Sequence, residues 1–202
     1  MLLIGSGNRG KAFELAGLLE GLPWDVRCLA DYAPAAGPVP PPVEDGLTFE
    51  ENAVKKAVYF SDVFGAACLA DDSGLVVDAI GGAPGIYSAR YAGPEADDKA
   101  NNAKLLADLD GVAEADRTAR FVCYAAFVRP GEPPHVEKGV VEGRIGFRPR
   151  GSGGFGYDPL FIPEGHTRTF GEMEMAEKKL ISHRGLALQK MRAYLERLAA
   201  RE

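Results

Sequence analysis

The first twelve residues combine a short apolar run, a glycine-rich turn and the start of an amphipathic segment. Leu2–Gly5 is apolar and ends in glycine, which is typical of a buried strand. From Lys11 onward, apolar residues recur at helical spacing until Pro23 closes the segment. A buried strand, a tight turn and a helix in this order form the basic unit of an α/β protein, so this opening strongly constrains the fold.

The remaining chain alternates helices and strands at first and then clusters its strands. Thr48 and Glu51 form a capping-box pattern that predicts a helix reaching about Phe64. Further strands are predicted near 24–29, 66–70, 75–77, 118–128 and 136–145, and further helices near 97–109, 172–179 and 185–198, whereas 81–93 is predicted to be neither. No repeat or linker divides the chain. We expect one domain over residues 1–202, with an α/β fold built on an elongated mixed sheet with flanking helices and two lobes.

The composition of the 202-residue chain excludes several classes of protein. Apolar residues make up 46% and charged residues 26%, which excludes a disordered chain. No apolar run approaches the roughly 18–20 residues of a membrane span, and the glycine-rich turn interrupts what a signal peptide would need, so no membrane partner is expected. A net charge of −6 argues against a nucleic-acid partner. Cys28, Cys68 and Cys123 lie far apart and are predicted to be buried thiols, which favours a cytoplasmic protein.

Gly5–Ala12, GSGNRGKA, nearly fits the phosphate-loop pattern G-x-x-x-x-G-K-[ST]. Such a loop directs backbone N–H groups and a helix N-terminus at an anion and places a lysine beside it. The mismatch is Ala12, because the pattern needs a hydroxyl there to hold Mg²⁺. The residues therefore favour phosphate binding over a true phosphate-loop NTPase, with an ordinary glycine-rich turn as the alternative.

Acidic residues form the second notable group. Asp71–Asp72 follows a buried strand, where ligand sites of α/β sheets usually lie, and Glu44–Asp45 precedes the capped helix. Carboxylates of this kind suit Mg²⁺, and one could instead accept a proton from water. Because Ala12 cannot hold a metal, an acidic metal site is favoured. The alternative is that the aspartates cap a turn with Ser73–Gly74.

Cations and aromatic rings form two further groups. The cations are Lys11, Lys55 or Lys56, Lys178 or Lys179, and His183 with Arg184. Taken singly, each lysine is more typical of a solvated surface residue than of a binding site, and a lone histidine at a helix start is more often structural. The loop Gly153–Pro159 flanks two aromatic residues with glycines and an aspartate, so its rings could face a planar ligand, or be buried in a tight turn.

Five segments together resemble one family, the inosine/xanthosine triphosphate pyrophosphatases, or Ham1-like enzymes. The segments occur in the family order: SGNRGK (6–11), GLTFEENAVKKA (46–57), ADDSGLVVDAIGGAPGIYSARYAG (70–93), GGFGYDPLF (153–161) and EKKLISHRGLAL (177–188). The resemblance implies Mg²⁺-dependent cleavage between the α and β phosphorus atoms of ITP, dITP or XTP. The products are the monophosphate and pyrophosphate, and the reaction removes deaminated purines from the nucleotide pool. It also implies a homodimer and a site in a central cleft between the lobes.

The resemblance assigns roles to individual residues. Glu44 and Asp72 belong to the metal site, Asp72 is also the proton acceptor, and Asp71 and Ser73 flank it. The proline-rich segment 33–42 beside Glu44 leaves Asp45 as an alternative ligand. The residues implied in triphosphate binding are Ser6, Gly7, Asn8, Arg9, Gly10, Lys11 and Lys56, and those implied in base and phosphate contacts are Phe155, Gly156, Tyr157, Asp158, Lys178, His183 and Arg184.

The residues leave two rival functions to be tested. A phosphate-loop kinase or NTPase would cut the γ-phosphate and release orthophosphate, but Ala12 argues against it. A nucleotide sensor without chemistry would need the loops but not the acidic residues. Under the pyrophosphatase hypothesis, Arg184 and the loop around Phe155 choose the base, whereas Asp72 and the lysines set the rate.

Overall fold

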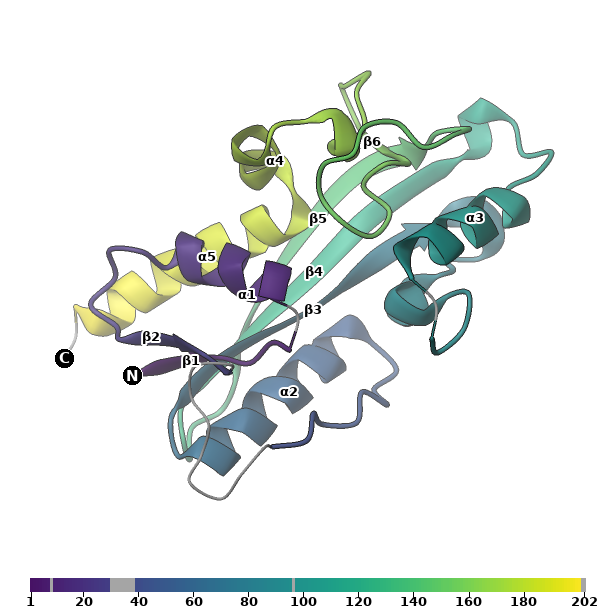
Figure 1. Ribbon diagram of the computed structural model, residues 1–202. Helices are drawn as coiled ribbons and strands as arrows, with labels where there is room; N and C mark the ends of the chain where they lie inside the picture. Colours follow the sequence, from purple (N-terminus) through teal and green to yellow (C-terminus); the bar gives the residue numbers. More distant parts are fainter. Residues whose placement is uncertain (8, 30–38, 96, 201–202) are drawn as a thin grey trace. The chain divides into compact units, whose positions relative to one another are not determined.

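The computed structural model describes residues 1–7, 9–29, 39–95 and 97–200 (Figure 1). Within them, six strands form one mixed sheet in the order β2 (Val26–Cys28), β1 (Leu2–Ile4), β3 (Ala67–Val77), β4 (Thr118–Val128), β5 (His135–Ile145) and β6 (Phe161–Pro163). Strand β1 is parallel to β2 and β3, whereas β5 and β6 are antiparallel. The predicted α/β class with a mixed sheet and flanking helices is confirmed. Asn8 and most of the proline-rich segment lie outside the described residues.

The chain forms two compact units. Unit 1 comprises residues 1–72, 123–138 and 186–202, and unit 2 comprises 73–122 and 139–185. Strands β3, β4 and β5 each contribute residues to both units. The central cleft implied by the family resemblance stays a prediction.

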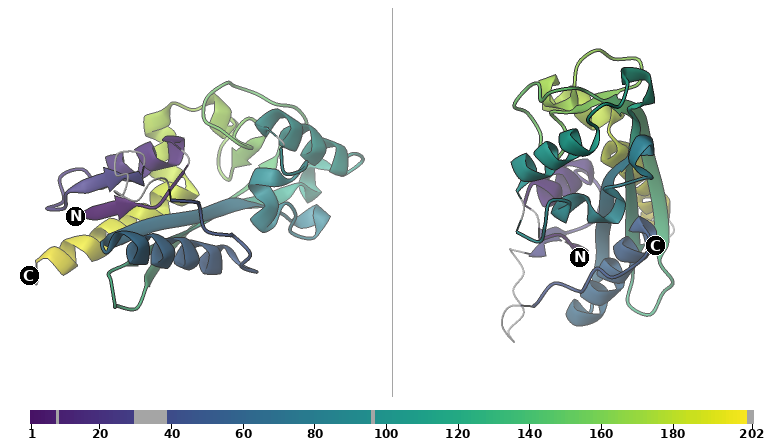
Figure 2. Two further views of the ribbon diagram at one scale, coloured as in Figure 1. Left: turned by 60° about the horizontal axis from the view of Figure 1, so that its bottom comes forward. Right: turned by 90° about the vertical axis from the view of Figure 1, so that its right-hand side faces the viewer.

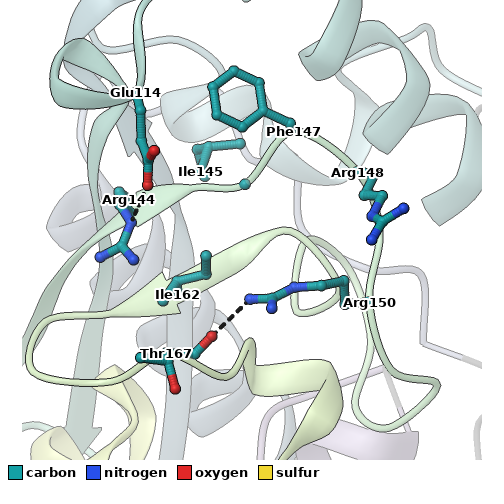
Figure 3. A pocket seen from close by; sticks show the side chains of 9 residues that line it. Glu114, Arg144, Ile145, Phe147, Arg148, Arg150, Ile162 and Thr167 are labelled. Atoms are coloured by element: carbon teal, nitrogen blue, oxygen red, sulfur yellow. Dashed lines mark hydrogen bonds and ion pairs between the residues drawn. The ribbon is translucent and has the colours of Figure 1, made fainter.

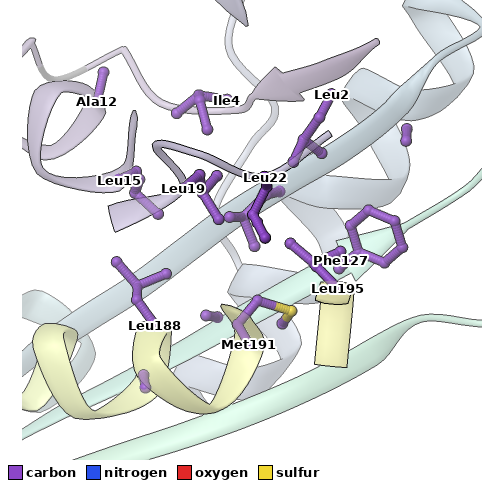
Figure 4. Packing of buried hydrophobic residues seen from close by; sticks show 14 of the residues in the cluster. Leu2, Ile4, Ala12, Leu15, Leu19, Leu22, Phe127, Leu188, Met191 and Leu195 are labelled. Carbon is purple, nitrogen blue, oxygen red and sulfur yellow. The ribbon is translucent and has the colours of Figure 1, made fainter. Parts of the chain in front are cut away.

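In unit 1, helices cover both faces of the short parallel strands. Helices α1 (Arg9–Leu18) and α5 (His183–Ala199) lie on one face, and α2 (Phe49–Phe64) lies on the other (Figures 1 and 2). Side chains of a strand alternate between faces, so Leu2 and Ile4 join the cluster beneath α1 and α5 (Figure 4). Leu3 packs on the other face with Phe60 of α2. Burial on both faces explains why β1 reads as an uninterrupted apolar run.

Helix α2 begins and ends at the residues that the sequence indicated. The Glu51 backbone N–H donates to Thr48 Oγ1 over 3.1 Å, and the Glu51 carboxylate accepts from the Leu47 N–H rather than from that of Thr48. Gly65 ends the helix in the left-handed conformation, with φ of 59°, which costs glycine little. The predicted helix start at Thr48 is confirmed.

Unit 2 contains helices α3 (Asp98–Asp108) and α4 (Met175–Ile181) and four short 3₁₀ helices, at Asp78–Ile80, Gly85–Arg90, Glu114–Asp116 and Phe170–Glu172. Its core includes Leu75, Leu105, Phe121, Phe161 and Phe170. Two predictions about these segments were wrong, and one strand was missed. The segment 81–93 contains a 3₁₀ helix, β6 was not predicted, and β3 is one continuous strand through Asp71–Gly74 rather than two pieces around a turn. Three-residue strands and 3₁₀ turns are too short to produce a periodic pattern.

Two expectations from the sequence, on the cysteines and on membrane-spanning segments, can be compared with the structure. None of the three cysteines forms a disulfide; Cys68 and Cys123 are buried as predicted, whereas Cys28 is only partly buried. Burial raises the pKa of the Cys68 thiol to about 12, so it stays protonated. Among the described helices, none combines the length and the apolar character that crossing a bilayer requires.

Candidate active site

Unit 1 contains a first candidate group, which begins with the turn between β1 and α1. The Gly5 N–H donates to the Leu69 carbonyl over 2.8 Å, which ties the turn to β3. A side chain at Gly5 would collide with Cys68 Sγ, 2.9 Å from the position of a Cβ. Helix α1 then begins at Arg9, of which only the backbone is described, and the predicted strand, turn and helix are confirmed. Lys11, in the first turn of α1, is half-buried.

The carboxylates of Asp71 and Asp72 lie on β3 and are 2% and 7% exposed. Because successive strand residues face opposite sides, Asp71 points toward α1 and Asp72 toward α2. Lys11 Nζ lies 3.8 Å from Asp71 Oδ2, and Lys56 Nζ of α2 lies 3.2 Å from Asp72 Oδ1. The alternative that these aspartates cap a turn with Ser73–Gly74 was wrong, since both lie within the strand.

Glu44 completes the group from the segment before α2. Its Oε1 lies 3.2 Å from Lys56 Nζ, so one ammonium group bridges Glu44 and Asp72. Asp45 instead pairs with the exposed Lys55, which lowers the pKa of the Asp45 carboxyl. Of the two alternatives that the sequence left open, the geometry places Glu44 beside Asp72.

The pKa values of this cluster show how burial and charge compete. Burial raises the pKa of Asp72 above its ordinary value of 3.8, although Lys56 and Lys11 act against this shift. Burial alone would lower the pKa of Lys56, but Asp72, Asp71 and Glu44 together raise it, so Lys56 stays charged. A carboxylate whose pKa is moved toward neutrality is a better proton acceptor at working pH.

Glu44 and Asp72 fit a divalent cation that arrives with phosphate. The described residues hold no cluster of three or more His, Cys, Asp or Glu side chains suited to a metal. Mg²⁺, however, is commonly held by one or two carboxylates, with phosphate oxygens and water filling the other positions. Two carboxylates converging on one ammonium group form a place where positive charge is already stabilised.

Unit 2 contains a candidate group of its own, the glycine-rich loop before β6. Asp158 Oδ2 accepts from the Phe155 N–H over 2.8 Å and pairs with Lys178 Nζ over 2.5 Å. Gly154 has φ of 73°, and a Cβ there would lie 2.0 Å from Asp158 Oδ2, so only glycine allows this turn. The carboxylate of Asp158 therefore fixes both the loop and the lysine.

Of the two rings in this loop, only Phe155 is accessible. Tyr157 is 3% exposed, its hydroxyl donates to the Ser88 carbonyl over 2.8 Å, and burial raises the pKa of that hydroxyl. The alternative of a tight turn with a buried ring therefore describes Tyr157. Phe155 is half-buried, and the cationic heads of Lys178 and Arg184 lie 4.9 and 5.4 Å from its ring centre.

His183 and Arg184 follow Ser182, whose hydroxyl accepts from the Gly185 N–H at the start of α5. Arg184 is 2% exposed and donates from Nη2 to Ser73 Oγ over 3.0 Å. The His183 ring stacks on Phe121, with ring centres 4.6 Å apart and planes 10° from parallel. In this structure Arg184 therefore faces the loop of Phe155, whereas His183 packs into the core.

Comparisons with known proteins decide the family. A model described as Ham1 family matches residues 2–194. The chain belongs to the Ham1 family. A dITP/XTP pyrophosphatase of an Exiguobacterium species is 51% identical over 95% of each chain, and one of Syntrophobacter fumaroxidans is 53% identical over 93% of this chain and 78% of the relative. A HAM1 protein structure from Coxiella burnetii has a TM-score of 0.87 at 39% identity and covers 96% of this chain and 97% of its own.

Sequence reasoning missed the residues of this Ham1 family member that support the loop of Phe155. Asp98 and Asn102 of α3 bind the backbone of Gly156, Ser88 binds Tyr157, and Phe121 supports His183. The only available signal was the polar helix start DDKANN at 97–102, which reads as ordinary capping chemistry.

A hollow elsewhere in unit 2 is lined by three arginines, two of which bind neighbouring residues of the same unit (Figure 3). Arg144 pairs with Glu114 over 3.6 Å, and Arg150 Nη2 donates to the Thr167 carbonyl over 2.8 Å. This hollow contains none of the predicted site residues.

Proposed function

We propose that this Ham1 family member hydrolyses ITP, dITP and XTP to the monophosphate and pyrophosphate. The observation that carries the proposal is the bridge from Lys56 to both Glu44 and Asp72, with Lys11 beside Asp71. Lysines suit the phosphates and carboxylates suit a metal ion, so this cluster has both parts that phosphoryl transfer needs. The relatives named dITP/XTP pyrophosphatase support the substrate class.

In the proposed mechanism, the turn from Ser6 to Lys11 and the ammonium of Lys56 bind the triphosphate. Glu44 and Asp72 hold Mg²⁺, which neutralises phosphate charge when bound. Asp72 accepts a proton as a water oxygen bonds to the α-phosphorus, and the bond from that phosphorus to the oxygen of the β-phosphate breaks. Pyrophosphate leaves with that oxygen and its electron pair.

The base is proposed to bind in unit 2, at Phe155, Lys178 and Arg184. The Phe155 ring offers a face to a planar purine, and the two cations beside it are hydrogen-bond donors. A group that donates a hydrogen bond to the 6-keto oxygen of hypoxanthine would face the amino group of adenine instead. Leaving this buried donor unpaired costs about 1–3 kcal/mol. This difference favours ITP over ATP.

Product analysis tests the proposed reaction directly. Incubation with ITP and Mg²⁺ is expected to give IMP and pyrophosphate in equal amounts, so that orthophosphate forms only after inorganic pyrophosphatase is added. IDP and orthophosphate as primary products would instead identify a γ-phosphatase. Tight binding of ITP without IMP would identify a nucleotide sensor.

We also infer a homodimer from the family resemblance. We infer a cytoplasmic location from the same resemblance and from three cysteines that form no disulfide, as expected in a reducing compartment. Sedimentation equilibrium is expected to give twice the chain mass of 21.5 kDa. The mass of a single chain at micromolar concentration would contradict the dimer.

A further inference from the structure

Two residues of α3 hold the backbone on both sides of Gly156. Asp98 Oδ2 accepts from the Gly156 N–H over 2.7 Å, and Asn102 Nδ2 donates to the Gly156 carbonyl over 2.8 Å. The N–H belongs to the peptide shared with Phe155, and the carbonyl belongs to the peptide shared with Tyr157. Both peptide planes next to Gly156 are therefore anchored to α3.

The start of α3 is arranged so that these two side chains are available to the loop. Asp97, not Asp98, caps the helix, by accepting from the Ala100 N–H over 2.8 Å. Asp98 and Asn102 are four residues apart and share one face of the helix. Asn102 is 8% exposed, and its Nδ2 also donates to the Asp98 carbonyl over 2.7 Å, which fixes the side chain.

The anchored segment carries the accessible ring of the loop. Gly156 has φ of 62° and directly follows Phe155, whose ring lies beneath Lys178 and Arg184. A change in the two anchored peptide planes would turn the Phe155 ring relative to these cations. Asp158 holds the Phe155 N–H, but α3 alone among the described contacts holds the two polar groups of Gly156.

We propose that Asp98 and Asn102 are positioning residues that set the base preference through the Gly156 backbone. The inference rests on the proposed function, because it requires the loop of Phe155 to bind the base. These residues do not touch the phosphates in this scheme, so their loss weakens base recognition and leaves the triphosphate contacts unchanged.

The decisive variant is Asn102→Leu, which removes the amide donor and keeps a similar volume. We expect KM for ITP to rise on the order of 10-fold, within the range for an unpaired buried carbonyl, with kcat changed less than about twofold. The preference for ITP over ATP, as a ratio of kcat/KM values, is expected to fall by a similar factor. The inhibition constant of inorganic tripolyphosphate, which has no base, is expected to stay unchanged.

Asn101→Leu is the matched control from the same helix turn. Asn101 holds a different segment, through the Ala92 N–H and the Ala89 carbonyl. The Asn101→Leu protein is expected to lose about as much stability as Asn102→Leu but to retain the wild-type KM for ITP and the wild-type preference for ITP over ATP. Asp98→Asn retains an acceptor for the Gly156 N–H and is expected to keep KM closer to wild type than Asp98→Ala.

Binding of IMP, measured by calorimetry without turnover, separates this inference from the proposed reaction. Asn102→Leu is expected to weaken IMP binding on the order of 10-fold, even if the products from ITP prove to differ from those proposed. A folded Asn102→Leu protein with wild-type IMP affinity and preference would overturn the positioning role. Equal effects of Asn101→Leu and Asn102→Leu on KM, or a parallel rise in the tripolyphosphate inhibition constant, would overturn it as well.

Discussion

Asp72→Asn is expected to lower kcat for ITP by about 10²- to 10⁴-fold, the contribution typical of a positioned proton acceptor. The amide keeps the size of the carboxyl group and can still accept a hydrogen bond from Lys56, which lies 3.2 Å from Asp72 Oδ1. It cannot accept the proton of the attacking water, and it is a poor ligand for Mg²⁺. Initial rates of pyrophosphate release under saturating ITP and Mg²⁺ measure the effect.

The unfolding free energy of the same variant checks that its fold is intact. Burial raises the pKa of Asp72, so the folded protein binds this proton more tightly than the unfolded chain does. Ionisation of Asp72 therefore lowers the free energy of unfolding as pH rises from the ordinary pKa of 3.8 to the higher pKa of the folded protein. Above that pKa the group causes no further loss. Lys56 keeps its ion pair with Glu44 in this variant, so its charge is not left uncompensated. Without metal, Asp72→Asn is therefore expected to be at least as stable as wild type at pH 7, with the gap closing toward pH 4.

Asp45→Asn provides the matched control for activity. Asp45 is exposed and pairs with Lys55 rather than with the buried cluster. Its replacement is expected to change kcat by less than about twofold, because exposed ion pairs contribute little. A folded Asp72→Asn protein with near-normal kcat would remove Asp72 from the mechanism.

Asp158→Asn is expected to destabilise the protein by roughly 3–5 kcal/mol, the usual cost of removing one partner from a buried ion pair. The side chains of Asp158 and Lys178 are 3% and 9% exposed, so the lysine charge would be left among Phe155 and Phe170 without its carboxylate. Urea unfolding followed by circular dichroism measures the loss as a lower midpoint.

Two further variants test the cause of this loss. Adding Lys178→Met to Asp158→Asn removes the uncompensated charge and is expected to restore much of the stability. Asp25→Asn breaks the pair with Arg27, in which both side chains are more than half exposed, and is expected to change stability by less than about 1 kcal/mol. An Asp158→Asn midpoint equal to that of wild type would show that the buried pair does not hold the loop.

Local signals in the sequence predicted much of the fold and part of the site. The apolar run 2–5, the glycine turn after it and Thr48 each indicated an element that the structure contains, because their effects act within a few residues. The carboxylates of Asp71 and Asp72 were found because they come directly after the apolar run 66–70, although the structure places them inside β3 rather than after it. The hydrogen bonds of Asp98 and Asn102 with the Gly156 backbone were not predictable, since Asp98 and Gly156 are 58 residues apart and only the tertiary fold brings them together.

Asp71 and Asp72 face opposite sides of β3, and this restricts where residues can be inserted into the chain or deleted from it. A deletion of one residue just before Asp71 would place Asp72 on the face of Lys11 and Ser73 on the face of Lys56, whereas an insertion there would place Asp71 on the face of Lys56 and the inserted residue on the face of Lys11. Either change would leave one of the two lysines facing a residue other than its aspartate. Insertions and deletions should therefore be confined to the loops, so that the register of β3 relative to α1 and α2 is kept.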